Sequence, residues 1–307
     1  MKKIVVTGGA GFIGSHLVDA LIEKKYDVYV ADDLSFGTKA FVHPKAHFFR
    51  VSILNPKFFS WLEKVHPEAI FHLAAQTNVR LSLEDPVCDA KINIFGSIKL
   101  ALKAKELGVK KIIFSSTGGA MFSNTKFLPY KESVPINPIS PYGIAKAACE
   151  QYLQTILSES STKLVILRYA NVYGPRQSHK GEAGVVSIFV RRLLENKPLT
   201  VFGDGMQTRD FIYVRDVVQA NIAALSSPSQ GIFHIGTGKE VSLKELLKRL
   251  TDISQLKLTV QYSPFVKGEL SRSALCPRKA LKELGWKPLV SLDQGLSLTL
   301  QGFKEKI

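Results

Sequence analysis

The sequence predicts an α/β fold with a doubly wound parallel sheet and a smaller C-terminal α/β lobe. Short apolar runs rich in β-branched residues alternate with helical patterns through the first 170 residues, and a glycine-rich turn follows the first run. Parallel strands need crossover connections, which helices usually supply. A chain of 307 residues also exceeds the usual size of one domain, so a second lobe is expected.

The predicted elements follow one another in strand–helix order. Strands are predicted at 3–8, 27–32, 69–75, 111–116 and 163–170, and helices at 12–25, 55–65, 91–108 and 141–158. Beyond Tyr173 the elements become shorter and loops contain more proline and glycine, with a helix predicted at 187–196. We expect a main domain at 1–170, to which parts of 209–238 return, and a lobe mainly at 171–307.

Composition limits where the protein works. With 45% hydrophobic and 22% charged residues, the chain has no apolar segment long enough to span a bilayer, and we expect no membrane association. Cys88, Cys149 and Cys276 are too few and too scattered for a disulfide framework, which favours a reducing cytoplasm. The seven histidines have no paired ligand spacing, so no metal site is predicted.

The net charge of +15 fits two classes of partner, nucleic acids and small anionic substrates. The basic residues occur in ones and twos, as in the pairs at 2–3, 24–25 and 191–192, without a basic tail. Such scatter is typical of a solvated helical surface. The distribution therefore favours a small anionic substrate and argues against nucleic acid.

A glycine-rich segment, "TGGAGFIG" at 7–14, lies between the first predicted strand and helix. It contains both Gly9-x-Gly11-x-x-Gly14 and Gly8-x-x-Gly11-x-x-Gly14. Glycines at such a turn let backbone N–H groups approach a pyrophosphate, while the helix N-terminus adds partial positive charge. Because tight strand–helix turns also use glycine for conformational reasons alone, the pattern needs a second signal.

Asp32 supplies that signal at the end of the second predicted strand. A carboxylate at this point accepts hydrogen bonds from both ribose hydroxyls of adenosine and repels a 2′-phosphate. The position therefore favours NAD over NADP. The alternative for Asp32, and for Asp33 beside it, is an ordinary turn residue at a strand end.

The segment "SPYGIAK" at 140–146 places Tyr142 one helical turn before Lys146, on the same face. A tyrosine with its usual pKa of about 10 is a poor base at neutral pH, and a nearby ammonium lowers that pKa. We expect Lys146 to lower the pKa of Tyr142 and to bind the cofactor ribose. The alternative is a surface pair at a helix start.

Together these motifs resemble the extended short-chain dehydrogenase/reductase family, and within it the NAD-dependent nucleotide-sugar epimerases and dehydratases. Further segments that carry the resemblance along the whole chain are "ADDLSFG" (31–37), "FHLAAQTNVRLSLEDP" (71–86), "FSSTGGA" (114–120), "RYANVYGPR" (168–176), "VFGDGMQTRDFIYVRDVV" (201–218) and "GWKP" (285–288). The resemblance implies a Rossmann domain at 1–170 and a nucleotide-sugar lobe at 171–307.

The resemblance also implies which residues act. Thr117, Tyr142 and Lys146 would be catalytic, with the threonine hydroxyl between the sugar O4 and the tyrosine. The residues implied for NAD binding are Gly8, Gly11, Phe12, Ile13, Gly14, Asp32, Asp33, Ser35, Gly37, Ser52, Ile53, Leu73, Ala74, Ala75, Asn93, Tyr142, Lys146 and Tyr169. Those implied for the substrate are Thr117, Asn171, Val186, Val201, Phe202, Arg209, Arg272 and Ser273.

Three positions depart from the family pattern. Ser52 stands where an aspartate near adenine is common, Val266 where an arginine commonly binds the diphosphate, and "MFS" at 121–123 where Val-Tyr-Gly is usual. Arg272 is a candidate to replace the missing arginine. Glycines at 118–119 stand where similar dehydratases carry acidic residues, which favours an enzyme that only removes a hydride and returns it.

The implied activity is 4-epimerisation of a UDP-hexose, glucose or galactose, through a transient 4-keto sugar. Alternatives are a nucleotide-sugar dehydratase or reductase of the same family, and a non-catalytic homologue that binds nucleotides. Ser273, at a position that lines the pocket near the sugar C2 in similar enzymes, is small enough to admit N-acetylated sugars. The resemblance further implies a role in galactose metabolism and a homodimer formed by helices around 91–108 and 141–158.

Overall fold

The computed structural model describes residues 1–123, 128–178, 184–264 and 270–305. Its centre is a seven-stranded sheet in the order β11-β6-β5-β4-β1-β2-β3, in which every neighbouring pair is parallel. The strands are β1 (Lys3–Thr7), β2 (Asp27–Asp32), β3 (His47–Arg50), β4 (Ala69–His72), β5 (Lys111–Thr117), β6 (Lys163–Tyr169) and β11 (Gly231–Ile235). This confirms the doubly wound α/β fold.

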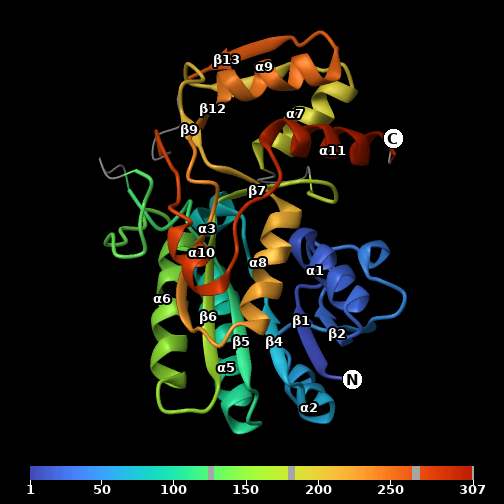
Figure 1. The fold of residues 1–307 in the computed structure, drawn as a ribbon, viewed down its shortest axis with the longest axis vertical. Helices are drawn as coiled ribbons and strands as arrows, with labels where there is room; N and C mark the ends of the chain where they lie inside the picture. The colour runs from blue at the N-terminus through green and yellow to red at the C-terminus, as the bar shows by residue number, and fades with distance from the viewer. Residues whose placement is uncertain (124–127, 179–183, 265–269, 306–307) are drawn as a thin grey trace.

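Helices cover both faces of the sheet (Figure 1). One face packs against α1 (Phe12–Glu23), α8 (Val214–Ser226) and α10 (Arg278–Leu284). The other packs against α2 (Pro56–Val65), α5 (Gly96–Glu106) and α6 (Pro141–Leu157). Because both faces are buried, the central strands are nearly continuous apolar runs, and such runs could be predicted from the sequence.

The smaller lobe has its own apolar core, centred on Phe189, Val201 and Leu246. Figure 1 shows it beyond the C-terminal ends of the strands of the main sheet. Its elements are α7 (Val185–Leu194), β8 (Leu199–Phe202), α9 (Leu243–Ser254), β13 (Val260–Ser263) and α11 (Leu292–Lys304). Two short sheets join it to the main domain, β7 (Asn171–Tyr173) with β10 (Phe211–Tyr213), and β9 (Thr208–Arg209) with β12 (Val241–Ser242).

Three local predictions need correction. The helix expected at 91–108 begins as a π-helical turn, η2 (Lys91–Phe95), and becomes α-helical only in α5. The segment 209–225 does not add a strand to the main sheet, because β10 pairs with β7, although α8 packs on that sheet. Strand β3 and the short helical segments η1 (Lys39–Phe41), α3 (Val79–Glu84) and α4 (Pro86–Ala90) were not predicted.

Candidate active site

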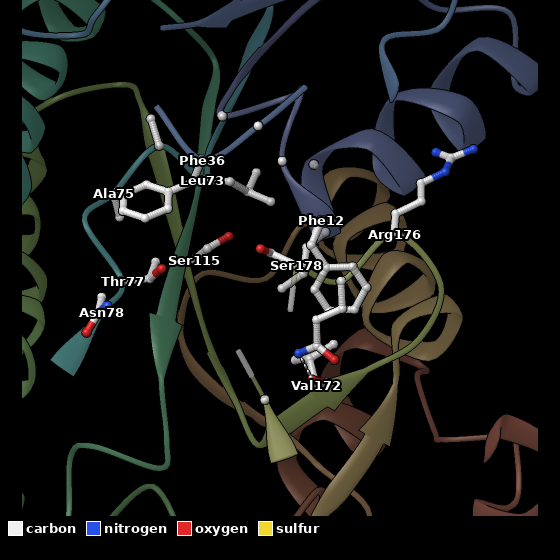
Figure 2. A pocket seen from close by; sticks show the side chains of 18 of the residues that line it. Phe12, Phe36, Leu73, Ala75, Thr77, Asn78, Ser115, Val172, Arg176 and Ser178 are labelled. Carbon is white, nitrogen blue, oxygen red and sulfur yellow. Dashed lines mark hydrogen bonds between the residues drawn. The ribbon is translucent and has the colours of Figure 1, made fainter. Parts of the chain in front are cut away.

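A cavity of about 1090 Å³ is lined by residues at the C-terminal ends of the central strands and by residues of the smaller lobe. Its walls come from both parts of the chain. Figure 2 shows residues that follow β4 facing residues of α1 and of the segment after β6: Leu73, Ala75 and Thr77 on one side, and Phe12, Val172 and Ser178 on the other. The size and the two-sided wall suit a ligand as long as a dinucleotide or a nucleotide sugar.

The glycine loop fits a pyrophosphate because side chains are excluded from it. A Cβ atom on Gly14 would lie 2.1 Å from the Gly8 carbonyl oxygen, and one on Gly8 would lie 2.7 Å from Ala74 N. Gly8 also has a φ of +72°, which favours glycine. Gly11 precedes α1 without a capping side chain, so the first N–H groups of the helix are available to an anion.

Gly9 has a different reason to be glycine. A Cβ atom there would lie 2.7 Å from Val30 Cγ1, on the neighbouring strand β2. The glycines of the two overlapping patterns therefore have different roles. Gly8, Gly11 and Gly14 shape the loop and its close approach to the helix, and Gly9 lets the loop pack on the sheet.

Asp32 ends β2 at the edge of the cavity, and backbone groups hold its carboxylate. Oδ2 accepts a hydrogen bond from Ala10 N at 3.0 Å, and Oδ1 accepts one from Leu34 N at 2.8 Å. Burial raises the pKa of Asp32, and these two bonds oppose that rise. Each oxygen keeps a second lone pair, so the carboxylate can accept bonds from a pair of ribose hydroxyls.

The other residues predicted for the cofactor line the same cavity, with one exception. The cavity is lined by Gly8, Gly11, Phe12, Ile13, Gly14, Asp32, Asp33, Ser35, Gly37, Ser52, Ile53, Leu73, Ala74, Ala75, Tyr142, Lys146 and Tyr169. Asn93 lies behind the wall instead. Its Oδ1 accepts from Gln76 N at 2.9 Å and its Nδ2 donates to Gln76 O at 2.9 Å, so it holds the loop after β4 in place.

Tyr142 stands in the first turn of α6, where the local sequence fixes the start of the helix. The Ser140 hydroxyl accepts from Gly143 N, and Pro141 occupies the first helical position. The side chain of Thr117, the last residue of β5, lies near enough to the Tyr142 hydroxyl to act on its pKa. Thr117 is half-buried and does not itself line the cavity, whereas Tyr142 does.

The expected lowering of the pKa of Tyr142 is wrong for this structure. Burial and then the negative charge of Asp89 raise that pKa, and the hydrogen bond to Thr117 opposes the rise. Burial also lowers the pKa of Lys146, which is 4% exposed. Its Nζ donates to the Ser115 carbonyl oxygen at 3.0 Å, so in this arrangement the ammonium is held by β5.

The residues predicted for the substrate are less well gathered. Asn171 and Val186 line the cavity, but Thr117, Val201, Phe202, Arg209, Arg272 and Ser273 are not among its lining residues. Arg272 forms a two-point ion pair with Glu240, through Nε at 2.8 Å and Nη2 at 2.5 Å. Ser273 is buried, and Val266 lies outside the described residues.

Sequence reasoning missed part of the cavity wall. Among the missed residues are Gln76, Thr77 and Asn78, in the loop that follows β4, and Arg176 and Phe303 from the later half of the chain. The first three had a signal, because polar residues just after a buried parallel strand stand where ligands bind. No sequence signal pointed to Phe303, because it reaches the cavity from α11, far along the chain from the other lining residues.

The departure at 121–123 has a packing explanation. Met121 and Phe122 are buried in a small apolar cluster with Tyr130 and Leu275. The ring of Phe122 stacks on Tyr130 with 4.2 Å between ring centres. This segment therefore supports the cavity from behind, and Ser52, the other described departure, contributes directly to the wall.

Metal sites and membrane spans are both missing from the described residues. No group of three or more His, Cys, Asp or Glu side chains there could hold a metal ion. No helix in those parts of the chain is long and apolar enough to cross a bilayer.

The fold and cavity define a dinucleotide-binding α/β protein, and comparison with known proteins gives its family. Residues 4–236 match the model of the NAD dependent epimerase/dehydratase family, and the chain belongs to that family. A UDP-glucose 4-epimerase of Mycolicibacterium smegmatis is 39% identical over 311 residues, which cover 99% of each chain.

Solved structures agree with this assignment. The chain resembles a UDP-glucose 4-epimerase of Thermotoga maritima with UDP-glucose, with a TM-score of 0.97, 46% identity and 99% of each chain covered. It also resembles a Thermus thermophilus UDP-glucose 4-epimerase in complex with NAD, with a TM-score of 0.95 and 38% identity over 99% of this chain and 100% of the other.

Proposed function

We propose that the protein is an isomerase that uses NAD to interconvert UDP-hexoses by epimerisation at C4. The observation that carries this proposal is that Tyr142 and Lys146 line the same cavity as the glycine loop and Asp32. An acid/base pair and a dinucleotide site in one cavity suit a reaction in which a hydride and a proton leave neighbouring atoms.

Each catalytic residue has a separate task in this proposal. Tyr142 removes the proton of the sugar O4 and later returns it. Thr117 hydrogen-bonds to the Tyr142 hydroxyl and stabilises its charged form. Lys146 holds the cofactor ribose and adds positive charge near Tyr142. NAD, when bound, supplies the hydride acceptor at C4 and gives the hydride back.

The half-buried position of Tyr142 raises the cost of its deprotonation, so the charges around it matter. In this arrangement the Thr117 side chain favours the phenolate, and the carboxylate of Asp89 opposes it. We infer that binding of NAD and sugar redirects Lys146 from the Ser115 carbonyl towards the ligand. The lysine would then act on Tyr142 as the sequence suggested.

Epimerisation is favoured over dehydration by the two residues after Thr117. Elimination of water needs an additional acid and base, and positions 118–119 are glycines. A Cβ atom on Gly118 would lie 2.3 Å from Leu275 Cδ1, so this position leaves no room for an acidic side chain without repacking. The non-catalytic alternative is disfavoured because Thr117, Tyr142 and Lys146 are all present.

We propose that the UDP-sugar binds along the side of the cavity formed by residues 171–307, with NAD held mainly by 1–170. Asn171 and Val186, which line the cavity, support this division. Arg209 and Asn171 would contact the diphosphate, with Phe202 and Val201 near the base. Arg272 would have to leave Glu240 to take part, which makes its role the weakest of this set.

We also propose a homodimer. Large apolar side chains are exposed on the adjacent helices η2, α5 and α6: Phe95, Leu102, Ile144 and Tyr152. Apolar residues seven or eight positions apart lie on one face of a helix, so these form two neighbouring stripes. A monomeric mass in solution at micromolar concentration would contradict this assembly.

The proposal extends to a cytoplasmic role in galactose metabolism. The three cysteines, Cys88, Cys149 and Cys276, are free, as expected in a reducing compartment. A strain that lacks the gene and still interconverts the two UDP-hexoses at the normal rate would contradict the metabolic role.

Purified protein incubated with UDP-galactose or UDP-glucose, and followed by NMR of the anomeric protons, tests the activity. We expect both reactions to reach the same mixture of the two sugars. A folded protein loaded with NAD that converts no UDP-hexose would overturn the proposal and favour the non-catalytic alternative. A product of changed mass would indicate a dehydratase or a reductase.

A further inference from the structure

The end of β5 is tied to α6 by three successive contacts. Residues 115–117 of the strand meet Tyr142, Lys146 and Glu150, which follow one another at intervals of four along the helix. The Ser115 carbonyl oxygen accepts from Lys146 Nζ at 3.0 Å, the Ser116 hydroxyl donates to Glu150 Oε1 at 2.6 Å, and the Thr117 side chain lies near enough to the Tyr142 hydroxyl to lower its pKa. One face of α6 is thereby set against consecutive residues of the strand.

Glu150 in turn pairs with Arg168 on the next strand, β6. The guanidinium donates from Nε at 2.9 Å to Oε1 and from Nη2 at 2.6 Å to Oε2. Arg168 is also the register partner of Ser116 across the two strands. The side chains of this ion pair are 2% and 4% exposed, so water does little to screen it.

A buried ion pair by itself is weak evidence for stability, because desolvation offsets much of its attraction. Here the pair has a specific geometric consequence. The Arg168 fork fixes both carboxylate oxygens of Glu150, and the fixed Oε1 then orients the Ser116 hydroxyl. Ser116 lies between Ser115 and Thr117, the two strand residues that contact the catalytic lysine and tyrosine.

We propose that Ser116, Glu150 and Arg168 form a positioning network that sets the distance between β5 and the catalytic face of α6. The inference rests on the proposed function and deepens it. Glu150 and Arg168 are not among the residues that line the cavity; Ser116 is, but its hydroxyl donates to Glu150, so we expect the network to act through Thr117 and Lys146. Misplacement of a catalytic group by about 1 Å can cost on the order of 100-fold in rate, so a single link can matter.

Ser116 offers the cleanest test because its hydroxyl can be removed while Glu150 and Arg168 stay paired. We expect Ser116→Ala to lower kcat for UDP-galactose about tenfold, since the strand end loses one link but not all. KM and the Kd for NAD should stay within about twofold, which separates a positioning role from loss of binding. Ser116→Thr keeps a hydroxyl and should recover most of the lost kcat.

Glu150→Gln tests the other end of the network. It weakens the pairing with Arg168 and should lower kcat further than Ser116→Ala. The matched control is Glu159→Gln, the same change at an exposed position just beyond the end of α6, which should leave kcat unchanged. If Glu150→Gln does not fold, Ser116→Ala and Ser116→Thr carry the test alone.

A readout that does not depend on turnover keeps this inference separate from the proposed function. The ¹³Cζ resonance of Tyr142, assigned by its loss in Tyr142→Phe, reports on the environment of the hydroxyl. We expect it to shift in Ser116→Ala and to stay in place in Glu159→Gln. An unmoved resonance in Ser116→Ala would overturn the network even in an active enzyme, as would an unchanged kcat. A wild-type protein without epimerase activity, together with a shifted resonance in Ser116→Ala, would overturn the proposed function alone.

Discussion

The cofactor side of the cavity depends on close backbone contacts at the glycine loop and at Asp32, whereas the opposite side includes charged side chains that pair with one another. On the cofactor side, Gly14 approaches the Gly8 carbonyl too closely for any Cβ atom, and Asp32 is fixed by two backbone N–H groups. On the opposite side, charged side chains hold one another, as Arg191 holds Glu195 at 2.5 Å. The first kind of site tolerates little substitution, whereas the second can change its pairing when a ligand binds.

The largest expected effect lies where the two sides meet, at Tyr142. Tyr142→Phe removes the hydroxyl that moves the O4 proton but keeps the ring that packs in the wall. We expect turnover to fall by roughly 100-fold or more, because a positioned acid/base group contributes that much. NAD should still bind, as measured by calorimetry. Unchanged turnover would remove Tyr142 from the mechanism.

Adding a single methyl group to the glycine loop should weaken the binding of NAD. Gly14→Ala places a Cβ atom 2.1 Å from the Gly8 carbonyl oxygen, so the loop has to move. We expect NAD to bind at least about tenfold more weakly, because that loop then loses its fit to the phosphates. Gly119→Ala is the control, since its Cβ atom would meet only Asn171 Oδ1 at 3.8 Å. Equal NAD affinity in the two variants would contradict this account of the loop.

Asp32 tests whether the cofactor side also selects between NAD and NADP. Its negative charge faces the position of a 2′-phosphate, so the wild type should bind NAD more tightly than NADP. Asp32→Asn keeps the shape and removes the charge, and should reduce that preference by about tenfold. Asp33→Asn, on the neighbouring cavity residue, should reduce it less. Tighter binding of NADP by the wild type, seen in calorimetry, would refute the assignment.

These differences explain how far the sequence could predict the molecule. Gly8, Gly14 and Asp32 were identifiable because their roles follow from backbone geometry and from spacing along a strand–turn–helix unit. The sequence predicted that Asn93 binds the cofactor. In the structure Asn93 hydrogen-bonds to Gln76 behind the cavity wall, because a sequence pattern identifies a position but does not show whether its side chain reaches the cavity.

The opposite side of the cavity could not be assembled in the same way. It combines Arg176, Val186 and Phe303, which lie on separate elements whose packing no local pattern records. The π-helical turn at 91–95 was also missed, because a helical pattern of 3.6 residues does not reveal a locally wider turn.

The raised pKa of Tyr142 predicts how activity depends on pH. Since the phenolate forms only as pH rises, kcat/KM should increase with pH on the acidic side of its profile. Burial is the largest cause of that raised pKa; the charges of Asp89 and Cys149 add to it, and the Thr117 side chain opposes it. Removing the negative charge of Asp89 should therefore move the acidic limb to lower pH.

Asp89→Asn is well suited to this measurement. Asp89 Oδ1 accepts from Gln76 and Asn93, whereas Oδ2 has no hydrogen-bond partner among the described residues. The amide introduced by Asp89→Asn can therefore keep its oxygen at the position of Oδ1, where it accepts the same two hydrogen bonds, and place its NH₂ group at the position of Oδ2. Glu84→Gln, at an exposed position on α3, is the control and should leave the profile in place. A limb that moves to higher pH in Asp89→Asn would contradict the electrostatic argument.

A last expected effect concerns Ser273, which is buried and does not line the cavity in this structure, but which is proposed to limit the size of the sugar at C2. Ser273 is 3% exposed, so a tyrosine there has to displace neighbours or extend towards the substrate. We expect the wild type to accept UDP-N-acetylgalactosamine, and Ser273→Tyr to lower its kcat/KM relative to UDP-galactose by about tenfold, near the low end of discrimination by pocket volume. Ser271→Tyr, at an exposed position two residues earlier, should leave the ratio unchanged. Rejection of the N-acetylated sugar by the wild type, or an equal ratio in both tyrosine variants, would place the limit on sugar size elsewhere in the wall.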